Sequence, residues 1–191
     1  AIAGCELSYA AARLAATNCA ACFEWRDDVY GGTWLHEAAD GGWLPTARAL
    51  VDSGAPLDVF DATNGVTPLY FAARQNETAV MRLLLDNGAD ATATRSATGI
   101  FPLGIAAYSG HSDGVRLLLQ HDATDVDQSV KWRATALHGA AFLGHSEIVQ
   151  LLIDAGADVT VVNCFGETAL QLATQRRHPD VAALLRRTMH G

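Results

Sequence analysis

The sequence predicts an all-α solenoid of stacked helix-turn-helix units, and three repeating features support this fold class. A short segment close to Thr-Pro-Leu-His occurs five times, and successive copies begin 34, 34, 34 and 33 residues apart. Each copy is followed by a pair of small residues, mostly Ala-Ala, and then by a second apolar segment. A period of roughly 20–50 residues is typical of solenoids, in which no unit can bury its apolar face alone. The copies begin at Thr33, Thr67, Phe101, Thr135 and Thr168.

The residues of one unit predict two helices joined by a tight turn. A threonine at the first position caps the first helix by accepting a backbone N–H, and Pro68 and Pro102 suit the first helical turn. The small pair lets the two helices approach closely, while the leucines at 83–85 fill the space between neighbouring units. Gly88 and Gly156 follow the second helix, where a residue in the left-handed conformation ends it.

These segments resemble the ankyrin repeat, and three motifs carry the resemblance. They are the Thr-Pro-Leu-His-like starts, the Ala-Ala-x-x-Gly-His segments at 106–111 and 140–145, and the Gly-Ala-Asp segments at 88–90 and 156–158. The resemblance covers about residues 28–187. It implies five repeats, at about 28–60, 61–94, 95–128, 129–161 and 162–191. Residues 1–27 match poorly, and we expect them to form an N-terminal helical cap or a degenerate repeat.

The composition disfavours several classes of function. The formal net charge of −8 argues against nucleic-acid binding, which requires neutralisation of phosphates. No apolar run approaches the roughly 18 residues of a membrane helix, and no charged segment precedes the apolar N-terminal part as in a signal peptide. Cys19 and Cys22 lack a second cysteine pair to complete a zinc site, and we expect no metal or other cofactor. Sparse cysteines are typical of a reducing compartment, so we expect a cytoplasmic or nuclear protein rather than a secreted one.

The resemblance implies a concave face, made of turn tips and first helices, on which most ankyrin-repeat proteins bind a protein partner. We expect aromatic side chains to gather there, because clustered exposed aromatics mark binding surfaces. The acidic residues of the first repeat predict a preference for a basic protein or peptide partner. The candidate groove residues are Tyr30, Glu37, Asp40, Phe71, Arg74, Tyr108, Lys131, Trp132, Phe142 and Phe165.

Histidines and glycines in the first helices predict different roles. His36 and His138 occupy the histidine position of the family, where the ring ties adjacent repeats together through backbone hydrogen bonds. Gly104 and Gly139 lie in adjacent repeats, and each costs its helix about 1 kcal/mol relative to alanine. Their missing side chains predict a hollow able to hold a small molecule, unless bulky neighbours refill the volume. Phe101, which replaces the N-cap threonine of the other repeats, is expected to pack as an apolar plug.

Three functions remain open from the sequence. The first is an interaction module that docks a protein or peptide across the aromatic groove. The second is a small-molecule binder or an acid–base enzyme of the isomerase or cyclase type, although no nucleophilic triad, phosphate loop or metal cluster supports it. The third is an architectural array within a larger protein, with which the absence of an initiating Met is compatible. The candidate acid–base groups are Glu37, Asp40, Tyr70, Tyr108, His36 and His138.

Overall fold

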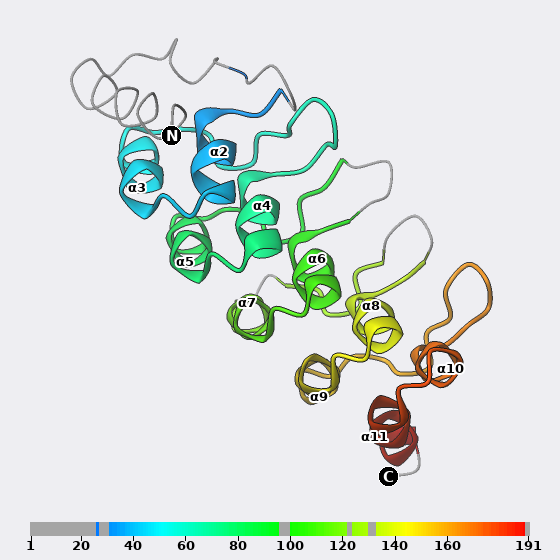
Figure 1. Ribbon diagram of the computed structural model, residues 1–191. Coiled ribbons are helices and arrows are strands. Elements are labelled where there is room, and N and C mark those ends of the chain that lie inside the picture. The colour runs from blue at the N-terminus through cyan, green and yellow to red at the C-terminus, as the bar shows by residue number, and fades with distance from the viewer. Residues whose placement is uncertain (1–25, 27–30, 96–99, 122–123, 130–132, 190–191) are drawn as a thin grey trace.

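The computed structural model describes residues 26, 31–95, 100–121, 124–129 and 133–189. Within these residues the chain forms ten α-helices and, apart from an isolated bridge between Val162 and Thr168, no β-structure. The helices alternate between two rows, as Figure 1 shows, and consecutive helices pack together as five pairs. The first helices of the pairs are α2 (Trp34–Asp40), α4 (Pro68–Gln75), α6 (Pro102–Ser109), α8 (Ala136–Leu143) and α10 (Ala169–Gln175). The second helices are α3 (Leu44–Asp52), α5 (Thr78–Asp86), α7 (Ser112–Leu119), α9 (Ser146–Asp154) and α11 (Pro179–Met189).

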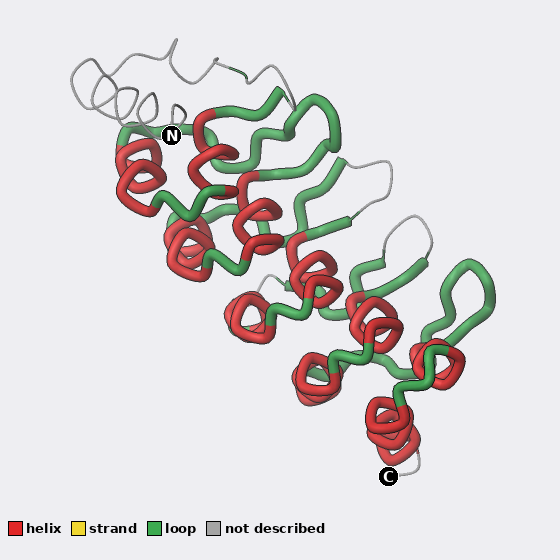
Figure 2. Tube along the Cα trace, viewed as in Figure 1, coloured by secondary structure: helices red, strands yellow, loops and turns green. Residues whose placement is uncertain are grey.

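Each helix packs against its pair mate and against the equivalent helix of the next repeat. One row runs from α2 through α4, α6 and α8 to α10, and the other from α3 through α5, α7 and α9 to α11. The long loops between the pairs, green in Figure 2, lie on the side of the first-helix row. The predicted all-α solenoid of stacked units is therefore confirmed, because the main contacts join neighbours in the stack.

Proline and alanine build the units as the sequence predicts, whereas the predicted threonine cap is confirmed only in part: Thr168 accepts the backbone N–H of Gln171, but the hydroxyl of Thr67 has no hydrogen-bond partner. Thr33, Thr67 and Thr135 precede α2, α4 and α8 in an extended conformation, and proline occupies the first position of α4 and α6. The alanine pairs of the first four repeats are fully buried, which lets each first helix lie close to its neighbours. Among the described helices, none combines the length and apolar character that crossing a bilayer requires.

Histidines just before the second helices tie the third, fourth and fifth repeats to the repeat before them. In three repeats an imidazole Nε2 contacts a carbonyl oxygen in the last turn of the previous first helix. These contacts join His111 to Arg74 (2.9 Å), His145 to Tyr108 (3.2 Å) and His178 to Phe142 (3.1 Å). Gly110 has a φ of +82°, and a Cβ atom there would lie 2.9 Å from the His145 ring. Glycine at this position therefore serves both the left-handed turn and the neighbouring imidazole.

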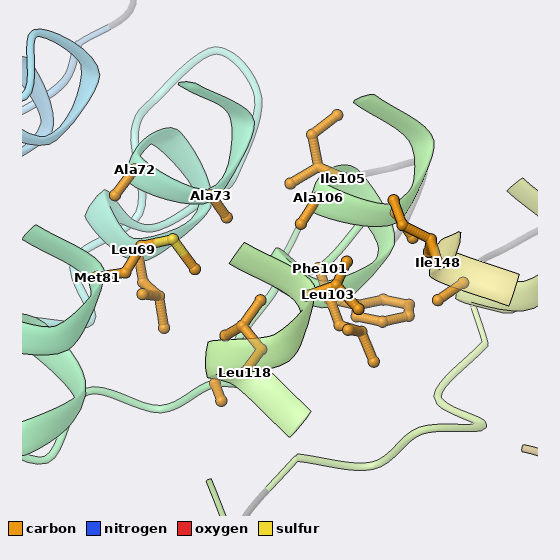
Figure 3. Close-up of a cluster of buried hydrophobic side chains, with 14 of the residues drawn as sticks. Leu69, Ala72, Ala73, Met81, Phe101, Leu103, Ile105, Ala106, Leu118 and Ile148 are labelled. Carbon is orange, nitrogen blue, oxygen red and sulfur yellow. The ribbon is translucent and has the colours of Figure 1, made fainter. Parts of the chain in front are cut away.

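A continuous apolar core runs through the stack, and Phe101 is one of its largest members. Its side chain is only 1 % exposed. Figure 3 shows it in a buried cluster with Leu103 of α6, Leu118 of α7 and Ile148 of α9. The prediction that Phe101 packs as an apolar plug is confirmed.

Candidate binding surface

A threonine–histidine pair closes the start of α2 and of α8. The backbone N–H of Thr33 donates to Nδ1 of His36 at 2.9 Å, and Nε2 of the same ring lies 3.2 Å from the carbonyl oxygen of Val66. His138 receives the backbone N–H of Thr135 in the same way, at 3.2 Å. Because Nδ1 accepts, each ring carries its proton on Nε2 and is neutral, and burial lowers the pKa of both histidines. Both buried rings have the structural role that the sequence predicts.

The third repeat replaces both members of this pair, with Phe101 for threonine and Gly104 for histidine. A Cβ atom on Gly104 would lie 3.4 Å from two carbons of the Phe101 ring, so the ring occupies the space beside the glycine. The second repeat shows the opposite case, because it keeps Thr67 and replaces the histidine with Tyr70. The buried hydroxyl of Thr67 then has no hydrogen-bond partner. The two changes in the third repeat belong together. The Phe101 ring needs the space that the missing side chain of Gly104 leaves, and without a threonine at position 101 no buried hydroxyl loses its histidine partner.

A hollow of about 340 Å³ remains beside Phe101, between the third and fourth repeats. A Cβ atom on Gly139 would lie 3.7 Å from Tyr108, which is an ordinary contact, so tight packing does not close the hollow at this glycine. Phe101 therefore fills only part of the volume that Gly104 leaves open. The lining residues are Ile100, Phe101, Gly104, Ile105, Tyr108, Ala134, Thr135 and Gly139.

Two large side chains are exposed on the first helices of the third and fourth repeats, and one of them, Tyr108, also lines the hollow. Tyr108 on α6 is 51 % exposed, and Leu143 on α8 is 37 % exposed. The Arg176 guanidinium lies over the ring of Phe142, with its central carbon 3.8 Å from the ring centroid. We call Tyr108, Gly139, Phe142, Leu143 and Arg176 the central surface.

Phe71 is not part of an exposed surface, contrary to the sequence prediction. Its side chain is only 3 % exposed, and its ring meets that of His36 edge to face at 5.6 Å. The Arg74 guanidinium lies 4.7 Å from the centroid of the Phe71 ring. The helical register puts residue 71 on the side of α4 facing the groove, but the ring packs against the preceding repeat.

Two acidic groups of the first two repeats, Asp40 and Asp61, are engaged within the protein. Asp40 accepts a hydrogen bond from Arg74 at 2.7 Å in a partly exposed ion pair. Asp61 is buried and accepts the backbone N–H of Val66 at 2.8 Å. Glu37 is half-buried on α2 and does not line the hollow. These contacts weaken the expectation that the first repeat selects a basic partner.

The other predicted aromatic groove residues and Lys131 divide into one that the structure describes and three that it does not. Phe165 lies in the hairpin before α10, where it is 74 % exposed, and it does not line the hollow. Tyr30, Lys131 and Trp132 lie outside the residues that the structure describes.

Leu143 and Arg176 belong to the central surface but were not among the selected candidates. The candidates were six aromatic and four charged residues, and both Leu143 and Arg176 were passed over, although helical register places them on the exposed face of the first helices. The repeat itself carries the signal that locates Arg176. It follows Phe142 by 34 residues, one repeat length, and equivalent positions of stacked repeats are neighbours.

Comparison with known protein families matches the chain to the family described as "Ankyrin repeats (3 copies)", over residues 7–95 and 103–190. The match covers most of the chain, which therefore belongs to the ankyrin-repeat family. Ankyrin repeats are generally protein–protein interaction modules. A search of curated proteins finds no match to this chain.

Proposed function

We propose that this ankyrin-repeat protein binds a segment of another protein across the central surface. The observation that carries the proposal is that two large side chains on adjacent repeats, Tyr108 and Leu143, are exposed, and that Tyr108 also lines the hollow. Exposed apolar clusters mark interaction sites, and tyrosine is a frequent anchor. A protein partner is favoured over a nucleic acid because the net charge of −8 repels phosphates. Sparse cysteines favour a cytoplasmic or nuclear setting.

Preorganisation supports the same proposal. The carbonyl of Tyr108 accepts from Nε2 of His145, and the carbonyl of Phe142 accepts from Nε2 of His178. The backbone at both aromatic positions is thus held by the following repeat. A surface that is already ordered loses less conformational entropy when a partner binds, which raises affinity.

Selection of short random peptides on phage, with the immobilised chain as bait, tests the proposal. The Tyr108→Ala variant should weaken binding of the selected peptides by about 2 kcal/mol, roughly 30-fold in Kd. Met189→Ala is the matched control, because Met189 is also a large exposed apolar side chain but lies on α11. The proposal fails if no peptide is enriched, or if the enriched peptides bind the Tyr108→Ala variant as tightly as the wild type.

The hollow favours a second candidate function, the binding of an apolar small molecule. Its volume of about 340 Å³ falls at the lower end of the range of small-molecule pockets, about 300–1,000 Å³. Of the predicted acid–base groups, Tyr108 alone is among the residues that line the hollow. In the described part of the chain, no group of His, Cys, Asp or Glu side chains could hold a metal ion. The geometry therefore supports binding better than acid–base catalysis.

Thermal-shift screening with apolar fragments tests this second candidate. A fragment that binds in the hollow should raise the melting temperature of the wild type and of Gly139→Ala, but not of Gly139→Leu, whose longer side chain fills the space. Stabilisation that persists in the Gly139→Leu variant would place the fragment elsewhere.

A further inference from the structure

Arg176 is an exposed cation at the edge of the central surface. Among the described residues, no carboxylate lies within ion-pair distance of its guanidinium. Arg74 provides the contrast, because it too lies over a phenylalanine ring but is neutralised by Asp40 at 2.7 Å. Stacking on Phe142 at 3.8 Å holds the Arg176 head group in place while leaving its N–H donors available.

In contrast to the charged guanidinium of Arg176, the hollow is apolar. Its lining is almost entirely carbon, contributed by Ile100, Phe101 and Ile105 and by the two glycines. The hydroxyl of Thr135 is already engaged, since it lies 3.0 Å from Nδ1 of His138. An occupant of the hollow therefore gains by burying apolar surface and finds no charged group to neutralise.

The two features lie close enough for one short peptide to reach both. Gly139 and Phe142 are three residues apart on α8, which corresponds to about 4.5 Å along the helix axis. The hollow lies on the α6 side of α8, whereas the Arg176 guanidinium comes from the α10 side and lies over the Phe142 ring, so about one helix spacing of 8–10 Å separates the two features across the stack. The combined separation is about 10 Å, the length of about three residues of extended chain.

We propose that the partner is a peptide segment carrying a bulky apolar side chain and, within about three residues, a single carboxylate. The apolar side chain enters the hollow beside Tyr108 and Gly139, and the carboxylate binds Arg176. This proposal rests on the proposed function and specifies the chemistry of the partner. One acidic residue fits better than a run of acids, because the net charge of −8 repels a strongly acidic segment.

The test uses the peptides selected on phage and a panel of charge variants. Selected peptides should share an aromatic or large aliphatic residue with an aspartate or glutamate within about three positions. Replacing that acid with alanine should weaken binding to the wild type about fivefold and leave binding to Arg176→Ala unchanged. Arg176→Glu should reverse the preference, so that lysine is favoured over glutamate at the same position. Arg177→Glu is the matched control, since Arg177 is the exposed neighbour and lines a separate hollow at the end of the stack.

The outcomes separate this inference from the function on which it rests. Peptides that require Tyr108 but show no acidic preference, or whose preference persists in Arg176→Glu, overturn the inference and leave the proposed function standing. Failure to enrich any Tyr108-dependent peptide overturns both. A dimer in solution that Tyr108→Ala dissociates would identify a second copy of the chain as the occupant and would also overturn the inference.

Discussion

The linked replacement of Thr and His by Phe101 and Gly104 makes a prediction about coupling. Three variants, Phe101→Thr, Gly104→His and the double variant, restore in part or in full the threonine–histidine pair found in the fourth repeat. Phe101 is fully buried, and its ring lies in ordinary contact with the position of a Cβ atom on Gly104. Each single replacement should therefore destabilise the protein, whereas the second should compensate for part of the damage caused by the first.

The magnitudes follow from the contacts. Loss of the buried Phe101 ring should cost about 3–5 kcal/mol. A histidine at position 104 should cost about 1–3 kcal/mol through overpacking against that ring, offset in part by the better helix propensity of a residue other than glycine. In the double variant the overpacking disappears, and two hydrogen bonds like those of His138 become available at about 1 kcal/mol each. The coupling energy should be favourable by about 2 kcal/mol or more.

Urea unfolding of the four proteins, followed by circular dichroism, measures this coupling in a double-mutant cycle. Phe101→Thr combined with Gly156→Ala provides the additive control: alanine is strained at the φ of +89° of residue 156, but its Cβ atom would contact nothing within 4 Å, so the two changes share no neighbour. Free energies for Phe101→Thr and Gly104→His that add to within about 0.5 kcal/mol would refute the view that the two residues replace the pair as a unit.

Two further predictions concern histidine. Glu77 holds the position of His111 in the second repeat, so Glu77→His should add an Nε2–H bond to the carbonyl of Asp40 and raise the free energy of unfolding in urea by about 0.5–1 kcal/mol. A decrease would contradict the stabilising role given to the histidines that join successive repeats. Burial lowers the pKa of His36 and His138 below 6.5, so their contribution to stability is complete above pH 6.5 and is lost as the pH falls through 6.5 towards the lowered values. The urea concentration at the unfolding midpoint should therefore decrease as the pH is lowered from about 7.5 to about 5.5. An equally steep decrease in a variant with glutamine at both positions would contradict the assignment of this pH dependence to the two histidines.

The period of the sequence predicted the stack, the role of the histidines and the burial of Phe101, because each depends on repeat position alone. It did not predict the burial of Phe71, since register gives the face of a helix while the side-chain rotamer decides which neighbour the ring meets. The ion pair between Asp40 and Arg74 could have been predicted from the sequence, because the two residues are 34 apart and occupy equivalent positions of stacked repeats. The volume of the hollow beside Phe101 could not be predicted from the sequence, since it depends on how the Phe101 ring packs against Gly104 and Gly139.

The most direct test of the central surface is backbone amide chemical-shift mapping of the labelled protein with a selected peptide. The account predicts that the largest shifts cluster on α6, α8 and the end of α10, including Tyr108, Gly139 and Leu143. Shifts concentrated on the second-helix row, at α5, α7 and α9, would show that the partner binds the opposite side of the stack and would contradict the account.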